Sequence, residues 1–206
     1  MNIDIPPITK CWIGGIILTG VANSLKLVDA LDLIFIPKNV IKKFEFWRVL
    51  TCACYFGPFS LSLFILLSTI YTIFGGLEKK QFEFRRGNLI FIFILIEFLI
   101  LVLSARFDSI EIGSSLIIAF CYIYGKLFTG EHLGFMMIEM PVQFIPFASM
   151  IVTFLHDGSL KSSIIGLCAG HFVFYLLFIL PTIVGKPIIR PPKLFSKIFD
   201  KPEPSI

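Results

Sequence analysis

The chain has 206 residues, a formal net charge of +4 and 56% hydrophobic residues, with 24 Phe and a mean hydropathy of +0.89. Soluble domains contain about 45–50% apolar residues including Gly. This composition excludes an ordinary soluble domain, because too little polar surface remains to cover one. It indicates a membrane protein, in which each helical crossing needs about 20 mostly apolar residues.

Six apolar stretches predict six transmembrane helices, which nearly exhaust the chain. They run over 11–35, 51–76, 89–104, 110–128, 142–155 and 162–184. We therefore expect an all-α membrane protein with a cytosolic N-terminus at 1–10, a membrane domain at 11–184 and a short Pro-rich cytosolic tail at 185–206. Five Pro residues in the tail argue against helix over most of that segment.

The distribution of basic residues predicts the orientation. With six crossings, eleven of the 18 Lys and Arg residues lie on the side that the two termini share, and six lie on the other side. Cytosolic loops carry an excess of Lys and Arg. Both termini are therefore expected in the cytosol.

The loop after the first stretch combines charge with aromatic rings in Phe46-Trp47-Arg48. Such a mixture suits a segment in the headgroup layer, where a ring's apolar body and polar tip are both satisfied. On spacing alone, Trp47 and Arg48 fit a simple interfacial belt. The second stretch is then interrupted by Gly57-Pro58, and the fifth is short and contains Pro146.

Glu97 lies in the middle of the third and most apolar stretch. A carboxylate there costs about 2.5–3.5 kcal/mol on insertion scales, so it should face protein or a wet cavity. Two interpretations stay open. Glu97 lines a substrate path, or it is protonated and bonded to a hydroxyl on the neighbouring helix; the hydroxyls considered are those of Ser62, Ser68 and Thr72.

The sixth stretch contains Gly166, Gly170 and His171. Glycines four residues apart share a helix face and allow a neighbouring backbone to approach closely. Packing is therefore the expected role of the pair, and His171 is expected to be a hydrogen-bonded structural residue. Five Cys residues lack the spacing of a redox or zinc pair, so we expect free buried thiols, no metal and no cofactor.

Several motifs in this order make the chain resemble the Derlin family of rhomboid-like pseudoproteases over nearly its whole length. The motifs are Pro7-Ile8-Thr9-Lys10-Cys11-Trp12, Phe46-Trp47-Arg48-Val49-Leu50-Thr51 with Phe56-Gly57, Leu77-Glu78 with Phe82, Pro146, Gly166-Leu167-Cys168-Ala169-Gly170-His171 and Pro192-Lys193-Leu194-Phe195. The resemblance implies a rhomboid-like bundle in the endoplasmic reticulum membrane. It also implies a role in moving misfolded proteins to the cytosol for degradation.

The resemblance carries further expectations about sites and partners. The Trp47-Arg48 loop looks like a hairpin anchored in the lumenal leaflet, and helices two and five look like a lateral gate beside a thinned bilayer, with Gly57, Pro58, Pro146 and Glu97 as candidate path residues. Expected partners are misfolded proteins, a membrane ubiquitin ligase complex and lipid. No Phe-Gly-rich motif follows the sixth stretch, so a cytosolic AAA ATPase is expected only indirectly. A homo- or hetero-oligomer stays open, and no nucleic acid is expected.

The alternative function is an active rhomboid intramembrane serine protease. Ser115 in Gly113-Ser114-Ser115-Leu116 falls at the nucleophile position, but Leu116 replaces the Gly that should follow. Ser163 occupies the position of the rhomboid His, and His171 lies about two helical turns further on. We therefore expect no enzyme activity, because a Ser without a base within about 3 Å is a poor nucleophile. A third class, a small transporter, is disfavoured because no internal repeat is visible.

Overall fold

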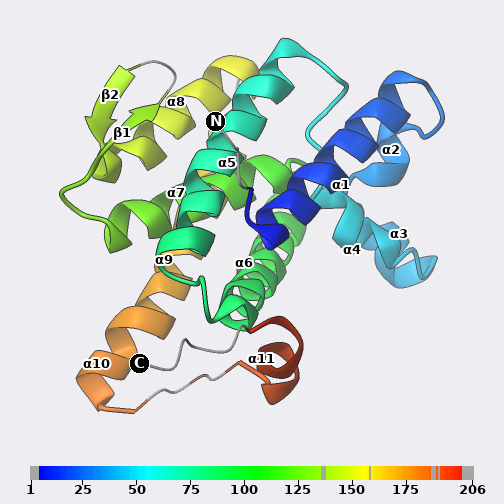
Figure 1. Ribbon diagram of the computed structural model, residues 1–206. Helices are drawn as coiled ribbons and strands as arrows, with labels where there is room; N and C mark the ends of the chain where they lie inside the picture. Colours follow the sequence, from blue (N-terminus) through cyan, green and yellow to red (C-terminus); the bar gives the residue numbers. More distant parts are fainter. Residues whose placement is uncertain (1–4, 136–137, 158, 187–188, 190, 201–206) are drawn as a thin grey trace.

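The computed structural model describes residues 5–135, 138–157, 159–186, 189 and 191–200. Helices dominate it (Figure 1): α1 (Pro7–Ser24), α2 (Ala30–Leu33), α3 (Pro37–Lys42), α4 (Trp47–Cys52), α5 (Leu61–Lys80), α6 (Arg86–Phe107), α7 (Ile112–Leu127), α8 (Ile145–Asp157), α9 (Lys161–Phe174), α10 (Leu180–Val184) and α11 (Lys193–Phe199). Two short strands between α7 and α8, β1 (His132–Phe135) and β2 (Ile138–Pro141), pair antiparallel. No strand was predicted at this position from the sequence.

Three of the helices are long and apolar enough to cross a membrane, namely Ser62–Lys80, Arg86–Phe107 and Lys161–Val184. Ile112–Leu127 and Val142–Leu155 are apolar but shorter. Helix α1 has 18 residues and belongs to neither group. The described part of the chain is thus a mostly helical protein with three membrane-capable helices, and six crossings remain an expectation.

The first two expected stretches are each divided by a backbone turn. Helix α1 ends at Ser24 rather than continuing to residue 35, because Lys26 adopts a left-handed φ of 57° and the Asn23 side chain donates to the Val28 carbonyl at 3.1 Å. The second stretch breaks at Gly57, which has a φ of 91° that a side chain would disfavour. The predicted boundaries of both stretches were therefore wrong.

Prolines mark the boundaries of the last spans. Pro146 lies in the first turn of α8, where its missing N–H costs no hydrogen bond, so it begins the helix rather than interrupting it. Helices α9 and α10 form one continuous helix through a π-helical segment, Tyr175–Ile179, just before Pro181. Pro181 cannot donate to the previous turn, which explains the wider turn there. The Pro-rich tail contains α11, a helix of seven residues that begins directly after Pro192.

Helix α7 is the central helix of the bundle, because twelve of its sixteen residues are buried. Its closest neighbour is α9. A Cβ on Gly166 would lie 2.2 Å from the Ser115 carbonyl oxygen, and one on Gly170 would lie 2.8 Å from that of Ala119. These two positions have no room for a side chain, so the helix backbones touch there.

An aromatic cluster joins four helices on the other side of the core. The Trp12 ring of α1 makes edge-to-face contacts with Phe74 of α5, Phe93 of α6 and Phe120 of α7, at centroid distances of 4.9, 5.0 and 5.9 Å. The indole N–H donates to the Ala53 carbonyl at 2.9 Å. The ring therefore also fixes the start of the connection to α5.

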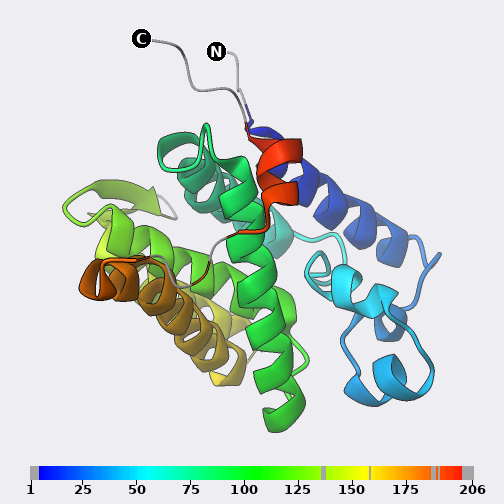
Figure 2. The same ribbon diagram turned by 90° about the horizontal axis from the view of Figure 1, so that it is seen from below.

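The two ends of the described chain meet the same end of the bundle. The buried Glu78 carboxylate at the end of α5 accepts from the Ile8 and Thr9 amides at 3.1 and 2.8 Å, so it caps the start of α1. The Asp200 carboxylate accepts from the Gly87 amide at 2.7 Å, which fixes α11 across the start of α6 (Figure 2). Both termini therefore lie beside the α5–α6 connection.

Replacing Gly166 with Ala should destabilise the protein by about 1–3 kcal/mol, because the α7 and α9 backbones must separate to admit the methyl group. The matched control is Gly14→Ala in α1, where nothing lies within 4 Å of the new atom. There the change should stabilise the helix by up to about 1 kcal/mol. Thermal unfolding of the two purified variants in detergent makes the comparison. Equal stability of the two would contradict the close α7–α9 crossing.

Candidate functional site

A cavity of about 350 Å³ lies between α5 and α8. Its walls come from the first half of α5, the middle of α8, the start of α7 and the connection between α4 and α5. The lining residues are Ile34, Cys52, Tyr55, Phe56, Gly57, Ser62, Leu63, Ile65, Leu66, Thr69, Ile110, Glu111, Gly113, Ser114, Ile117, Phe135, Ser149, Val152 and Thr153. The cavity therefore occupies the half of the bundle remote from the chain termini.

Hydroxyl groups from three helices line this cavity among aliphatic side chains. Ser62 and Thr69 on α5 are seven residues apart, and Ser149 and Thr153 on α8 are four apart, so each pair shares one helix face. Ser114 adds a hydroxyl from the start of α7. This spacing was visible in the sequence, but only the fold shows that the two faces oppose each other.

Two of these hydroxyls, on Thr69 and Thr153, have local partners that leave lone pairs available. Thr69 donates to the Ile65 carbonyl at 3.0 Å, and Thr153 donates to that of Ser149 at 2.9 Å. Each hydroxyl oxygen still accepts from a water molecule or from a polypeptide N–H. The wall is therefore wettable although it lies between apolar helices.

The end of the cavity remote from the termini is covered by the connection between α4 and α5. The Phe56 ring lies against Gly113, where a Cβ would come within 2.6 Å of it. Tyr55 donates to the Asn23 side-chain oxygen at 3.0 Å, and burial raises the pKa of its phenol. The cover is thus positioned by contacts to α1 and α7.

The residues proposed as a substrate path do not all reach this cavity. Gly57 lines it, whereas Pro58, Pro146 and Glu97 are absent from its described lining. Glu97 is 6% exposed, and its Oε1 atom has no hydrogen-bond partner among the described residues. The hydroxyls considered as its partners belong elsewhere, since Ser62 lines the cavity and Thr72 donates to the Ser68 carbonyl at 2.8 Å. Neither interpretation of Glu97 gains support from this geometry.

The residues of a rhomboid active site do not come together. Ser115 is fully buried and donates to the Ser162 carbonyl at 2.8 Å, while the Ser163 hydroxyl is buried without a partner among the described residues. His171 Nδ1 instead shares a hydrogen bond of 2.6 Å with the Tyr122 hydroxyl. Tyr122 follows Ser115 by seven residues on α7, or by about 10 Å along the helix. The imidazole is therefore held away from Ser115.

Trp47 and Arg48 occupy contrasting environments at the start of α4. The Trp47 side chain is 55% exposed, whereas Arg48 is 3% exposed. The Arg48 guanidinium bonds to the Leu31 carbonyl, to the Ile34 carbonyl at 3.2 Å and to Asp32 at 3.3 Å. It also pairs with the Glu45 carboxylate at 2.5 Å. Arg48 thus ties α2 to α4 from inside the protein, and only Trp47 is available to lipid.

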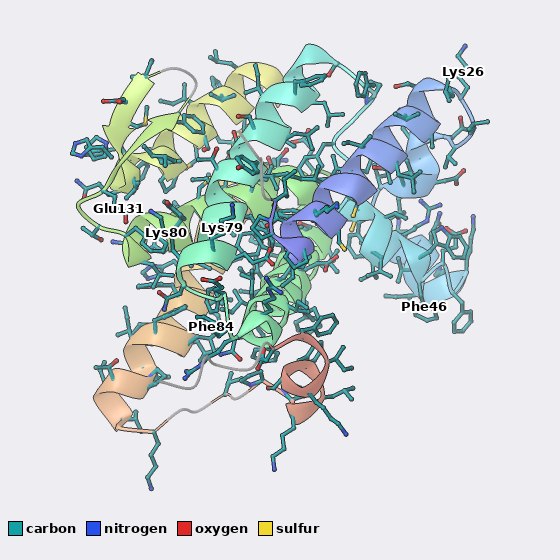
Figure 3. All side chains as sticks on the ribbon, in the orientation of Figure 1. Lys26, Phe46, Lys79, Lys80, Phe84 and Glu131 are labelled. Atoms are coloured by element: carbon teal, nitrogen blue, oxygen red, sulfur yellow. The ribbon has the colours of Figure 1, made fainter. Side chains whose placement is uncertain are left out.

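Elements α2 to α4 form a lobe on the side of the bundle opposite the β1–β2 hairpin (Figures 1 and 2). Phe46 points outward from this lobe (Figure 3), and its exposed fraction is 60%. Ile41, Phe44 and Leu50 are at least 70% exposed. An apolar surface of this kind fits lipid rather than water.

The five cysteines are free, as expected, but not all of them are buried. Cys52 and Cys121 are buried, while Cys11 and Cys168 are exposed on α1 and α9. Among the described residues, no cluster of three or more His, Cys, Asp and Glu side chains could hold a metal ion.

The sequence of this chain is similar to a known protein family and to several of its members. A model of the Der1-like family matches residues 5–193. Derlin-1 of Arabidopsis thaliana is 29% identical over 198 residues, which cover 95% of this chain and 74% of the relative. Derlin-1.1 of Zea mays is 26% identical, with 95% and 82% covered, and the probable derlin-2 homolog of Dictyostelium discoideum is 24% identical, with 98% and 83% covered. This chain therefore belongs to the Der1-like family.

Proposed function

We propose that this protein helps misfolded polypeptides leave the endoplasmic reticulum for degradation in the cytosol, and that it does so without covalent chemistry. The cavity between α5 and α8 carries the proposal, because a wettable groove within a membrane bundle lowers the cost of placing unpaired peptide groups there. Membership of the Der1-like family supports the same role.

The length of α8 supports a second part of the mechanism. Its 13 residues span about 20 Å, whereas the hydrocarbon core is about 30 Å thick. Such a short helix is accommodated by local thinning of the bilayer or by snorkelling at its ends. A polypeptide that enters between α5 and α8 then crosses less hydrocarbon than elsewhere.

We infer the orientation in the membrane from the two ends of the described chain, which lie at the same end of the bundle. The basic residues of the α5–α6 connection lie at the same end, including Lys79, Lys80, Arg85 and Arg86. We assign this end to the cytosol by the excess of positive charge. The cavity is then on the lumenal half, where a lumenal substrate would enter, and the α2–α4 lobe lies in the lumenal leaflet.

We infer the partners of this protein from its proposed role in export and not from any contact in the structure. The proposed substrates are misfolded proteins, which are to be passed to a membrane ubiquitin ligase complex. A cytosolic AAA ATPase is proposed to act only indirectly, through another subunit.

Photocrosslinking tests the path directly. A photoreactive amino acid in place of Thr69 or Val152 should crosslink to a stalled lumenal degradation substrate, because both residues line the cavity. The control is Phe98, which is 62% exposed on α6 and absent from the cavity lining. Crosslinks at Phe98 that equal those at Thr69 would contradict a path between α5 and α8.

The two residues of the first loop should respond differently to truncation. Arg48→Ala should destabilise the α2–α4 lobe by about 1–3 kcal/mol, because it removes the buried guanidinium that bonds the Ile34 carbonyl and pairs with Glu45. Trp47→Ala should leave the protein folded but slow substrate clearance by loosening the loop from the leaflet. Thermal unfolding and a cycloheximide chase separate the two effects. Unchanged stability of Arg48→Ala would show that the buried contacts are dispensable.

The protease alternative predicts labelling of Ser115 by a fluorophosphonate probe. We expect no labelling and no cleavage of a rhomboid reporter, because no base among the described side chains bonds to Ser115 and its hydroxyl donates to the Ser162 carbonyl. The reference is an active rhomboid assayed in the same detergent. Cleavage that disappears in Ser115→Ala would overturn the non-catalytic assignment.

A further inference from the structure

Helix α11 uses one face to dock on the start of α6. A Cβ on Gly87 would lie 2.7 Å from the Phe195 carbonyl carbon, so the two backbones are in direct contact (Figure 2). Asp200 at the end of α11 accepts from the Gly87 amide at 2.7 Å. The helix is therefore held against the bundle at both its middle and its end.

The opposite face of α11 is apolar and has no described protein neighbour to cover it. Leu194 and Ile198, one turn apart, are 65% and 60% exposed. Lys193 and Lys197 are also exposed and adjoin this face at the same four-residue spacing. Two cations beside an apolar stripe are typical of a helix that lies in a membrane interface.

The position of α11 in the bundle corresponds to the level of the membrane interface. It crosses the first turn of α6, a span with a mean hydropathy of 2.7 that begins directly after Arg85. The start of such a span marks the level at which the bundle leaves hydrocarbon. The leaflet on the cytosolic side carries anionic lipids that attract basic segments next to a span.

We propose that α11 is a lipid-binding helix, which inserts Leu194 and Ile198 among the acyl chains and pairs Lys193 and Lys197 with anionic headgroups of the leaflet at the start of α6. A protein partner fits this surface less well, because seven residues with two apolar side chains on the free face offer far less than the roughly 800 Å² per partner of a stable interface. Binding to a lipid bilayer does not require a contact area of that size.

The Asp200–Gly87 contact couples this anchor to the bundle. When α11 is held at the headgroup layer, the start of α6 is held there too. The lipid-binding role rests on membrane insertion and not on the export function, so the two can fail separately.

The test uses the full chain in vesicles. Cys11 and Cys168, the two exposed cysteines, are changed to Ser, and an environment-sensitive fluorophore is attached to Ile198→Cys. A nitroxide on the fifth acyl carbon should quench the probe in vesicles that contain phosphatidylserine, and quench it less in pure phosphatidylcholine. K193Q together with K197Q should lower the ratio of inserted to withdrawn helix about 25-fold, or about fivefold for each charge.

The matched control is K38Q with K42Q on α3, two exposed lysines with the same spacing in the lobe at the other end of the bundle. This pair should leave the quenching at residue 198 unchanged. Absence of quenching in both lipids would overturn the proposal, as would quenching that ignores phosphatidylserine and the α11 lysines. A probe shielded from water-soluble quencher only in native microsomes would assign the surface to a protein partner instead.

Discussion

The close crossing of α7 and α9 is the contact on which the rest of the bundle depends. Gly166 and Gly170 bring the two backbones together, and Ser115 donates to the Ser162 carbonyl across the same seam. In lipid, close packing and interhelical hydrogen bonds must supply what the hydrophobic effect supplies in water. This side of α7 is therefore sealed, and any opening has to form on its other side.

The opening lies where α7 faces α5 and α8, and three features maintain it. Helix α8 is short, the break at Gly57 delays the start of α5 to Leu61, and Phe56 lies over Gly113 at the covered end. The α2–α4 lobe next to it is braced from inside by Arg48 rather than by lipid contacts. In the proposed mechanism, the short α8 beside the cavity makes the bundle thinner on this side than on the other.

Composition and the order of the motifs were sufficient to predict a mostly helical membrane protein and to identify its family. The glycine pair and the interruption at Gly57 were also visible, because each reflects a local requirement on the backbone. The ends of α1 were not, since the left-handed Lys26 and the Asn23 contact to Val28 depend on the turn that follows. The β1–β2 hairpin has no alternating pattern that would identify it in the sequence.

Contacts between residues far apart in the sequence could not be predicted either. Glu78 caps α1 from 69 residues away at Thr9, and the Arg48 guanidinium reaches a carbonyl 17 residues back at Leu31. The motifs in the sequence included these residues, but they did not show which residues Glu78 and Arg48 contact. Arg48 was therefore predicted to anchor the loop together with Trp47, and its contacts to carbonyl and carboxylate groups of α2 are a structural role that the sequence did not show.

The most direct test of the account is to lengthen α8. Four Leu inserted after Ala148 add about 6 Å and turn the rest of the helix by only about 40° beyond a full turn, so its cavity face is largely retained. Export of a lumenal substrate should stop while insertion and folding persist, and the same four Leu inserted after Ile183 at the end of α10 should leave export intact. Undiminished export with the longer α8 would contradict a route that depends on a short helix beside the cavity.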